Sequence, residues 1–428
     1  VYKRQTMNST SIVIRNFIGR YSQINWALLD QAMVSGVNFF TGIILVRFLG
    51  LEEFGRFTLT WLIILFFNSI QFAAVISPMM SIGPKQAERE LQQYYGAVVL
   101  QQLFWSGLCV ISIFSCVWGS QFFFDWQIHK LAAPLAAALL AVQSQDFLRR
   151  YFFVRERAAL AFVNDSISYL GRLLLLVVCF NFRVLDIMEV LWLIACSSGL
   201  ATVIGLFKTE RLIYHRTYVY KMIKEHWHFS KWLIVSALMQ WTSGNFFLIA
   251  AAGILGSFSV CAIKAAQNII GITHILFQAM ENFVPSKAAN SFTKEGARGL
   301  LKYLRGVSWY GGLFIAGIGF FAAIFSDFWF KCVYGNEFLN YSYLLKWFSL
   351  IYFVGFFVIP LSAGLRAIEI TKSLFSSLFF MSLLSVLLAY PLVSYLGLNG
   401  VMVGMLTVKL GILIYIGNDF KKNLKQFL

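Results

Sequence analysis

The sequence predicts an all-α integral membrane protein with twelve transmembrane helices, arranged as two six-helix lobes around a central cavity. Of its 428 residues, 59% are hydrophobic and 13% are charged, and the mean hydropathy is +0.71. A soluble domain carries roughly 25% charged residues. A chain this apolar cannot cover a folded surface with polar groups, so it requires lipid as its solvent.

Long apolar runs recur along the whole chain. About 20 such residues are needed for a helix to cross the hydrocarbon core of a bilayer. The expected spans are 25–48, 58–82, 96–119, 130–147, 162–180, 187–207, 231–254, 259–284, 306–326, 343–364, 372–394 and 398–417.

The placement of positive charge predicts the orientation, because Lys and Arg accumulate in cytoplasmic loops. With the N-terminus inside, twenty-six of the 35 Lys and Arg residues fall in inner segments and five in outer ones. Both ends are therefore expected in the cytoplasm. The net charge of +16 then reflects membrane topology, and we expect no nucleic-acid partner.

The longest stretch between expected spans, residues 208–230, is basic and aromatic. Its apolar positions are typical of an amphipathic helix on the inner leaflet, with a solvated linker as the alternative. They are Leu212, Tyr218 or Val219, Met222 and Ile223, and His226 and His228 are expected at the interface. The predicted domains are a cytoplasmic segment 1–24, an N-lobe 25–207, the linker 208–230, a C-lobe 231–418 and a cytoplasmic tail 419–428.

The two halves carry a weak repeat. Leu49-Gly50 and Leu255-Gly256 each close the first helix of a half, and Pro78 and Pro285 end the next helix. Six helices is an even number, so both halves would cross the membrane in the same direction, as in transporters built from parallel repeats.

Polar residues recur every three or four positions along the span at 259–284, which places them on one helix face. They are Lys264, Asn268, His274, Gln278 and Glu281, with Gly271 occupying the position of the stripe between Asn268 and His274. Polar groups at membrane depth face a bundle interior or a water-filled cavity. Hydrogen bonding between helices is the alternative, and for Lys264 so is snorkelling to the interface.

Three other spans carry weaker polar faces. The residues are Gln31, Ser35 and Asn38 at 25–48, Asn68 and Gln71 at 58–82, and Gln240 and Asn245 at 231–254. Small polar residues often join helices to one another. Taken together, four helices with polar faces, two from each half, favour a hydrated central cavity.

Charged residues also occur within the membrane. Arg172 is expected either to pair structurally or to attract phosphate through its planar guanidinium. For Asp165 we favour structural pairing, with neighbours of Arg172 or with Arg149 and Arg150, over a role in transport. Asp30 lies at the inner end of its helix, where the helix dipole favours an acid.

Signals for an enzyme are absent. The sequence has no GxSxG, HExxH or P-loop motif, and its outer loops hold no carboxylate pair. The six cysteines show no CxxC spacing. We expect no enzymatic activity, no cofactor and no metal site.

The stretch Arg47-Phe-Leu-Gly-Leu-Glu-Glu-Phe-Gly55 and the segment Asp146-Phe-Leu-Arg-Arg-Tyr151 resemble the Wzx-type polysaccharide and O-antigen flippases of the MOP exporter superfamily. The six-plus-six hydropathy extends this resemblance over nearly the whole chain. It implies a flippase of the bacterial inner membrane that moves undecaprenyl-pyrophosphate-linked oligosaccharide to the outer leaflet by alternating access, in lipopolysaccharide biosynthesis. Its partners would be this lipid-linked substrate, membrane lipids, H⁺ or Na⁺ as coupling ion, and polysaccharide polymerase and assembly proteins.

The resemblance also assigns roles. Lys264 and Arg172 would contact the pyrophosphate, and the Asn, Gln and Ser residues the sugar hydroxyls. The alternatives are a MATE-like multidrug or cation antiporter and a membrane-embedded glycosyltransferase, ligase or polymerase. Many MATE proteins carry an acid shortly before the closing glycine motif, whereas 42–47 has none. A membrane-embedded glycosyltransferase, ligase or polymerase would show a large outer loop, and none is visible in the sequence. A non-transporting scaffold is a further alternative.

Overall fold

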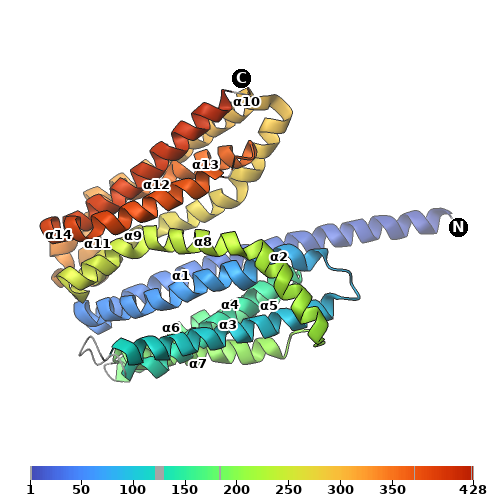
Figure 1. The fold of residues 1–428 in the computed structure, drawn as a ribbon, viewed down its shortest axis with the longest axis horizontal. Coiled ribbons are helices and arrows are strands. Elements are labelled where there is room, and N and C mark those ends of the chain that lie inside the picture. The colour runs from blue at the N-terminus through green and yellow to red at the C-terminus, as the bar shows by residue number, and fades with distance from the viewer. Residues whose placement is uncertain (1, 121–129, 183–184, 371, 426, 428) are drawn as a thin grey trace. The chain divides into compact units, whose positions relative to one another are not determined.

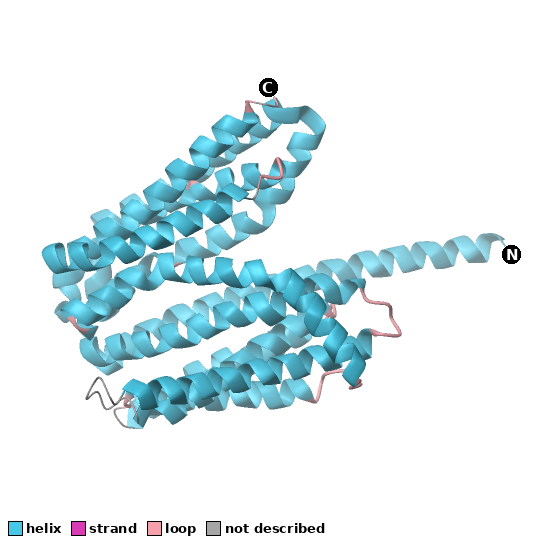
Figure 2. Ribbon diagram, viewed as in Figure 1, coloured by secondary structure: helices cyan, strands magenta, loops and turns pink. Residues whose placement is uncertain are grey.

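The computed structural model describes residues 2–120, 130–182, 185–370, 372–425 and 427. Within these ranges the regular structure is helical and no strand occurs (Figure 2). By length and composition, eight helices among them can cross a membrane. The predicted all-α, multi-pass membrane protein is therefore confirmed, whereas the count of twelve spans stays a prediction.

The elements follow one another along the chain with short connections (Figure 1). They are α1 (Tyr2–Gln71), the π-helix η1 (Phe72–Ile76), α2 (Ser77–Ile82), the 3-10 helix η2 (Gly83–Lys85), α3 (Leu91–Ser120), α4 (Ala132–Val154), α5 (Ala158–Asp165), the π-helix η4 (Ser166–Leu170), α6 (Gly171–Phe182), α7 (Ile187–Leu206), α8 (Arg216–Leu255), α9 (Ser257–Ile270), α10 (Ile272–Ile324), α11 (Ser326–Tyr334), the 3-10 helix η5 (Asn336–Tyr341), α12 (Tyr343–Phe356), α13 (Val358–Ala367) and α14 (Lys372–Leu424).

Three of the longest helices contain one glycine outside helical geometry. Gly50 in α1 has φ 76°, Gly296 in α10 has φ 65° and Gly397 in α14 has φ 57°. Side chains other than glycine rarely adopt positive φ. In Figure 1, α1 and α14 each double back along their length, and the glycine supplies the turn.

The chain divides into two compact units. The first unit comprises Val1–Thr41 and Phe67–Ile234, and the second unit comprises Gly42–Phe66 and Val235–Leu428. Helix α1 therefore contributes to both. The predicted lobes, 25–207 and 231–418, stay a prediction.

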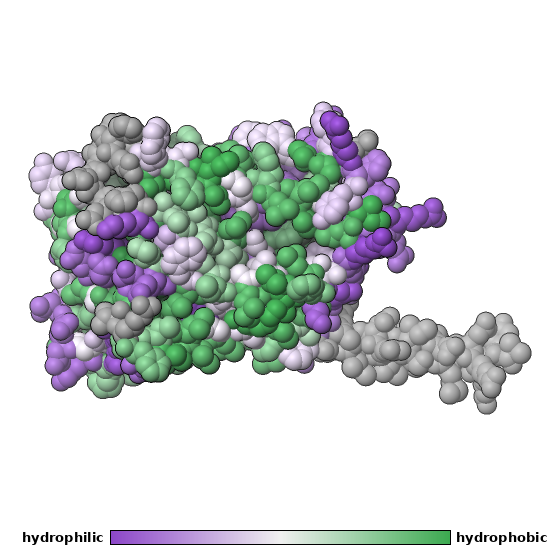
Figure 3. All heavy atoms as spheres, turned by 90° about the horizontal axis from the view of Figure 1, so that it is seen from below, coloured by the Kyte–Doolittle hydropathy of each residue, from purple (hydrophilic) through white to green (hydrophobic). Residues whose placement is uncertain are grey.

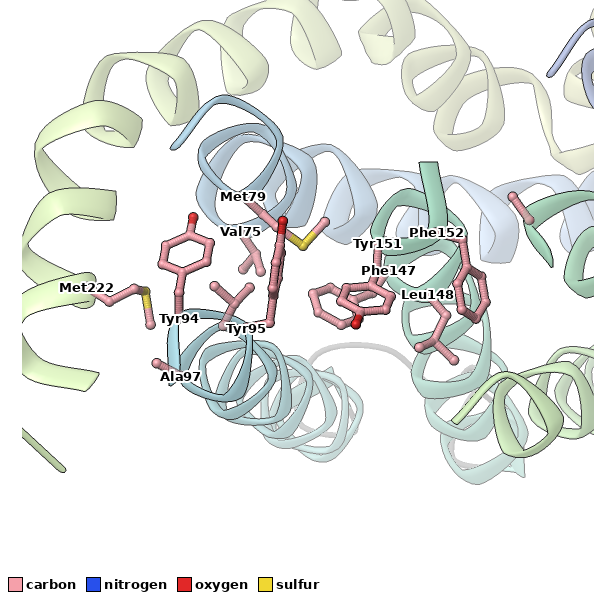
Figure 4. Packing of buried hydrophobic residues seen from close by; sticks show 12 residues of the cluster. Val75, Met79, Tyr94, Tyr95, Ala97, Phe147, Leu148, Tyr151, Phe152 and Met222 are labelled. Atoms are coloured by element: carbon pink, nitrogen blue, oxygen red, sulfur yellow. The ribbon is translucent and has the colours of Figure 1, made fainter. Parts of the chain in front are cut away.

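Aromatic residues of α3 and α4 form the core of the first unit (Figure 4). The rings of Tyr95 and Tyr151 meet edge to face, with centroids 5.2 Å apart, and Met79 of α2 packs beside them. Met222 of α8 is fully buried and points toward Tyr94. These contacts attach the start of α8 to the helices that precede it.

The predicted amphipathic segment 208–230 is helical from Arg216 onward. Leu212, Tyr218 and Val219 pack against the core of the first unit, whereas Ile223 is 46% exposed. Most of the apolar face is thus covered by protein, and its position on the inner leaflet stays a prediction.

The expectation that His226 lies at the interface is wrong. Its side chain is fully buried, and its two ring nitrogens contact the Tyr94 hydroxyl at 2.9 Å and Gln101 Oε1 at 2.7 Å. These partners come from α3, far away in sequence, so the pattern of residues around His226 could not reveal them.

Much of the described surface is apolar. In Figure 3, hydrophobic residues gather over the middle of the visible face and hydrophilic ones toward two opposite ends. Side chains such as Leu103, Phe104 and Ile111 on α3 are exposed. A soluble protein rarely exposes apolar patches of this extent.

Close helix packing in the second unit depends on glycines. A Cβ atom on Gly55 would overlap the backbone carbonyl of Ser257, and one on Gly42 would lie 2.9 Å from Asn268 Nδ2. Small residues allow helix backbones in membranes to approach closely. The residues 42–66 of α1 are thereby held against the start of α9.

We expect Gly55→Ala to lower the melting temperature of the purified protein, because the new methyl group meets a backbone atom that cannot rotate away. Overpacking of this kind costs about 1–3 kcal/mol. Gly107→Ala is the control, since no atom lies within 4 Å of its Cβ position. Equal melting temperatures for both variants would contradict the packing described here.

Candidate functional site

The first unit contains a buried ion cluster that joins three helices. Asp30 of α1 and Asp165 of α5 flank Arg149 of α4: Arg149 Nη2 lies 2.7 Å from Asp30 Oδ2, and Arg149 Nε lies 2.6 Å from Asp165 Oδ2. Both carboxylates are fully buried. Removing a charge from such a group leaves its partner unpaired in a low-dielectric interior.

Two amides extend this cluster. Gln145 donates to Asp165 Oδ1 at 2.6 Å and to Asn164 Oδ1 at 3.1 Å, and Asn164 donates to the carbonyl of Ala201 on α7 at 2.6 Å. The predicted structural pairing of Asp165 with Arg149 is confirmed. Arg150 instead contacts Asp146 at 3.4 Å.

Asp30 belongs to the cluster although its sequence position indicated only a favourable helix dipole. It and Arg149 lie far apart in the sequence and meet only in the folded chain. A lone acid within an apolar helix was the one available signal.

A second polar contact in the first unit involves Arg172. This residue is buried, donates from Nη2 to Asn38 Oδ1 at 3.3 Å, and lies 4.8 Å from the Tyr169 ring centre. Asn38 itself is exposed. The π-helix η4 separates Arg172 from Asp165. Such π-helical segments are frequent at functional sites.

The other predicted residues of the first unit lie in different surroundings. Gln31 donates to Ser35 Oγ at 3.2 Å along α1, and both are half-buried. Gln71 is fully buried and donates to Gln102 Oε1 and to the carbonyl of Gln143, each at 2.9 Å. Gln71 thus joins helices by hydrogen bonds. Asn68 lies one turn before Gln71 and is half-buried.

In the second unit, Lys264 lies on α9 and is half-buried. Its Nζ donates to Gln267 Oε1 at 2.8 Å, and Gln267 also forms a hydrogen bond with the Tyr352 hydroxyl of α12. Among the described side chains, no carboxylate forms an ion pair with Lys264. A neutral amide therefore holds this ammonium group in place.

Asn268 lies one turn beyond Lys264. Its Nδ2 donates to the Tyr334 hydroxyl at 3.2 Å, and that hydroxyl donates to the carbonyl of Ala265, also at 3.2 Å. Tyr334 ends α11, and its position could not be inferred from the helical pattern of α9. The structure thus brings Lys264 and Asn268 into one group with two tyrosines.

The predicted polar face at 259–284 is not one uninterrupted helix. Helix α9 ends at Ile270, the N–H of Gly271 bonds the carbonyl of Asn268, and the N–H of His274 bonds the carbonyl of Gly271. These i to i−3 bonds tighten the helical turn at Gly271. Beyond this break His274 and Glu281 are exposed and Gln278 is half-buried.

Three further polar side chains of the second unit lie on α8 and α14. Lys409 of α14 interacts electrostatically with Glu281 and is exposed. On α8, Gln240 is exposed, and Asn245 donates to the carbonyl of Trp241 at 3.0 Å within the same helix. In the described part of the chain, no three His, Cys, Asp or Glu side chains converge as a metal site requires.

No model of a known protein family matches the sequence, and no curated protein shows a significant sequence match. Several solved structures are similar to this chain. An inward-facing multidrug resistance MATE family transporter of the MOP superfamily aligns over 92% of this chain and 96% of its own, with a TM-score of 0.74 and 14% identity. The lipid II flippase MurJ, in an inward closed conformation, aligns over 92% of this chain and 87% of its own, with a TM-score of 0.69 and 14% identity.

A third similar structure is a point mutant of the Vibrio cholerae MATE transporter VcmN. It aligns over 96% of this chain and 98% of its own, with a TM-score of 0.64 and 15% identity. At these identities the similarity establishes the fold. The chain has the fold of these transporters and of this lipid II flippase.

We expect Arg149→Gln to destabilise the protein by about 3–5 kcal/mol, since two buried carboxylates lose their shared cation. Thermal unfolding of the purified protein would measure it. Arg150→Gln is the matched control, because its pair with Asp146 is 31% and 26% exposed and such pairs contribute at most about 1 kcal/mol.

The triple variant Asp30→Asn, Arg149→Gln, Asp165→Asn replaces the charged cluster by amides. It should recover most of the lost stability, because no uncompensated buried charge remains. A triple variant as unstable as Arg149→Gln alone would contradict the ion-pair explanation.

Proposed function

We propose that this protein is a flippase that moves undecaprenyl-pyrophosphate-linked oligosaccharide from the inner to the outer leaflet by alternating access. The observation that carries the proposal is Lys264. Its ammonium group is half-buried, is held by the neutral amide of Gln267 and forms no ion pair with a described carboxylate. A cation held in this way can attract an anionic headgroup.

The chemistry of the substrate fits this arrangement. A pyrophosphate is anionic, and its attraction to an ammonium group grows as the effective dielectric constant falls. The lipid tail can stay in the bilayer while the headgroup crosses through protein. Asn268 and Tyr334, next to Lys264, offer hydrogen-bonding groups of the kind that sugar hydroxyls require.

Arg172 is proposed as a second phosphate contact. It lies in the first unit beside Asn38 and Tyr169, both neutral groups. Guanidinium groups bind phosphate oxygens through two parallel hydrogen bonds, which a lysine cannot reproduce.

The similar solved structures support the class of protein and leave the substrate open. One of them is a lipid II flippase. Lipid II and the proposed substrate are alike in being lipid-linked. We further propose a bacterial inner membrane location with both termini cytoplasmic, coupling to H⁺ or Na⁺, and polysaccharide polymerase and assembly proteins as partners. The inner excess of Lys and Arg supports the orientation.

The alternative is a MATE-like multidrug or cation antiporter, which the similarity to multidrug transporters favours. The two functions require opposite charge in the binding site, because a cationic drug would be repelled by Lys264. An expressing strain that gains resistance to cationic drugs, without any effect on surface polysaccharide, would support the alternative.

We expect Lys264→Ala to reduce surface polysaccharide about tenfold or more in a deletion strain complemented with the variant. Losing a hydrogen bond to a charged group costs about 1.5–3 kcal/mol, which is at least tenfold in rate. Lys264→Arg should retain most activity because it keeps the charge.

Lys346→Ala is the control for Lys264→Ala. Lys346 also lies within a membrane helix, but it is exposed near the start of α12. Immunoblotting of membranes would establish equal insertion for all variants. Full activity of Lys264→Ala would remove this residue from the proposed site.

A further inference from the structure

The second unit contains a groove, formed by α10, α12, α13 and α14, with a volume of about 710 Å³. These four elements belong to the same unit (Figure 1). The volume lies within the roughly 300–1,000 Å³ of small-molecule sites. Its lining includes Arg305, Ser308, Trp309, Leu313, Ala316 and Phe353.

The three polar side chains of this groove all carry hydrogen-bond donors. Ser308 and Trp309 lie three and four residues after Arg305, so all three lie on one face of α10. Guanidinium, hydroxyl and indole N–H groups all donate hydrogen bonds, and no acid lines the groove. Among the described residues Arg305 has no hydrogen-bond or ion-pair partner.

The remainder of the groove is apolar and open to the outside of the protein. Trp309 is 72% exposed and Leu313 is 67% exposed, whereas Phe353 and Phe357 form the inner wall. Gly312 brings α10 close to this wall, since a Cβ atom there would lie 3.0 Å from the Phe357 ring. The groove thus offers a cationic end and an apolar length.

The chain around Arg305 in the sequence, and the chain at the ends of α13 and α14, is rich in basic residues. The stretches 286–305, 366–372 and 419–425 together hold ten Lys and Arg residues against three acids, Glu295, Glu369 and Asp419. The orientation proposed above places these stretches on the cytoplasmic side. Basic clusters between membrane helices on that side bind anionic lipid headgroups.

We propose that this groove binds an anionic phospholipid of the inner leaflet. Its phosphate contacts the Arg305 guanidinium, Ser308 and Trp309 donate hydrogen bonds to oxygens of the headgroup and glycerol esters, and one acyl chain lies along Leu313, Phe353 and Phe357. The charge of the groove selects the headgroup, and the apolar length accommodates the chain. This proposal does not depend on which substrate the protein transports.

Native mass spectrometry of the delipidated full chain in detergent tests the proposal, with phosphatidylglycerol and phosphatidylcholine added separately. We expect the wild-type protein to bind phosphatidylglycerol more tightly. Arg305→Gln should weaken phosphatidylglycerol binding about fivefold, equivalent to about 1 kcal/mol for one charge near an anionic lipid, and leave phosphatidylcholine binding unchanged. Ala316→Phe, which fills the groove, should weaken both.

Arg298→Gln is the matched control, because Arg298 is exposed in the same basic stretch but does not line the groove. Equal binding of the two lipids by the wild-type protein, or an equal loss for Arg298→Gln and Arg305→Gln, would overturn the proposal. So would tighter binding of undecaprenyl phosphate than of phosphatidylglycerol, since the occupant would then be an isoprenoid lipid.

Discussion

The fold of the first unit depends on the ion pairs that Arg149 makes with Asp30 and Asp165. Charges at membrane depth are costly unless they are paired inside the protein. One guanidinium satisfies carboxylates from two other helices, so α1, α4 and α5 are joined where lipid supplies no driving force for helix association. Asn38 and Arg172 lie on the continuations of the two acid-bearing helices, so the same ion pairs help to position them.

The second unit satisfies its polar groups differently. Around Lys264 and Asn268 the partners are an amide and two tyrosine hydroxyls, which are neutral. The positive charge of Lys264 is therefore solvated by dipoles rather than cancelled by a carboxylate. The charged cluster of the first unit holds helices together. Under the proposed function, the neutral surroundings of Lys264 leave its charge for an anionic substrate.

The sequence predicted the helical class, the multi-pass character and the pairing of Asp165 with Arg149, because hydropathy and intramembrane charge are local signals. It did not reveal that Asp30 shares Arg149, that His226 is buried against Tyr94, or that the polar face of 259–284 breaks at Gly271. Each of these depends on which helix packs against which, and periodicity within one helix carries no such information. Tyr334 and Tyr352 were missed for the same reason, since they reach the polar group of α9 from other helices.

The proposed function requires the protein to carry a lipid-linked sugar across the membrane. The most direct measurement is translocation of a fluorescent undecaprenyl-pyrophosphate-linked oligosaccharide in vesicles reconstituted with the purified protein, detected by a membrane-impermeant quencher. We expect the labelled headgroup to change leaflet in vesicles that contain the protein and to stay in place in protein-free vesicles. Equal rates in both kinds of vesicle, together with transport of a cationic drug by the same preparation, would contradict the proposed function.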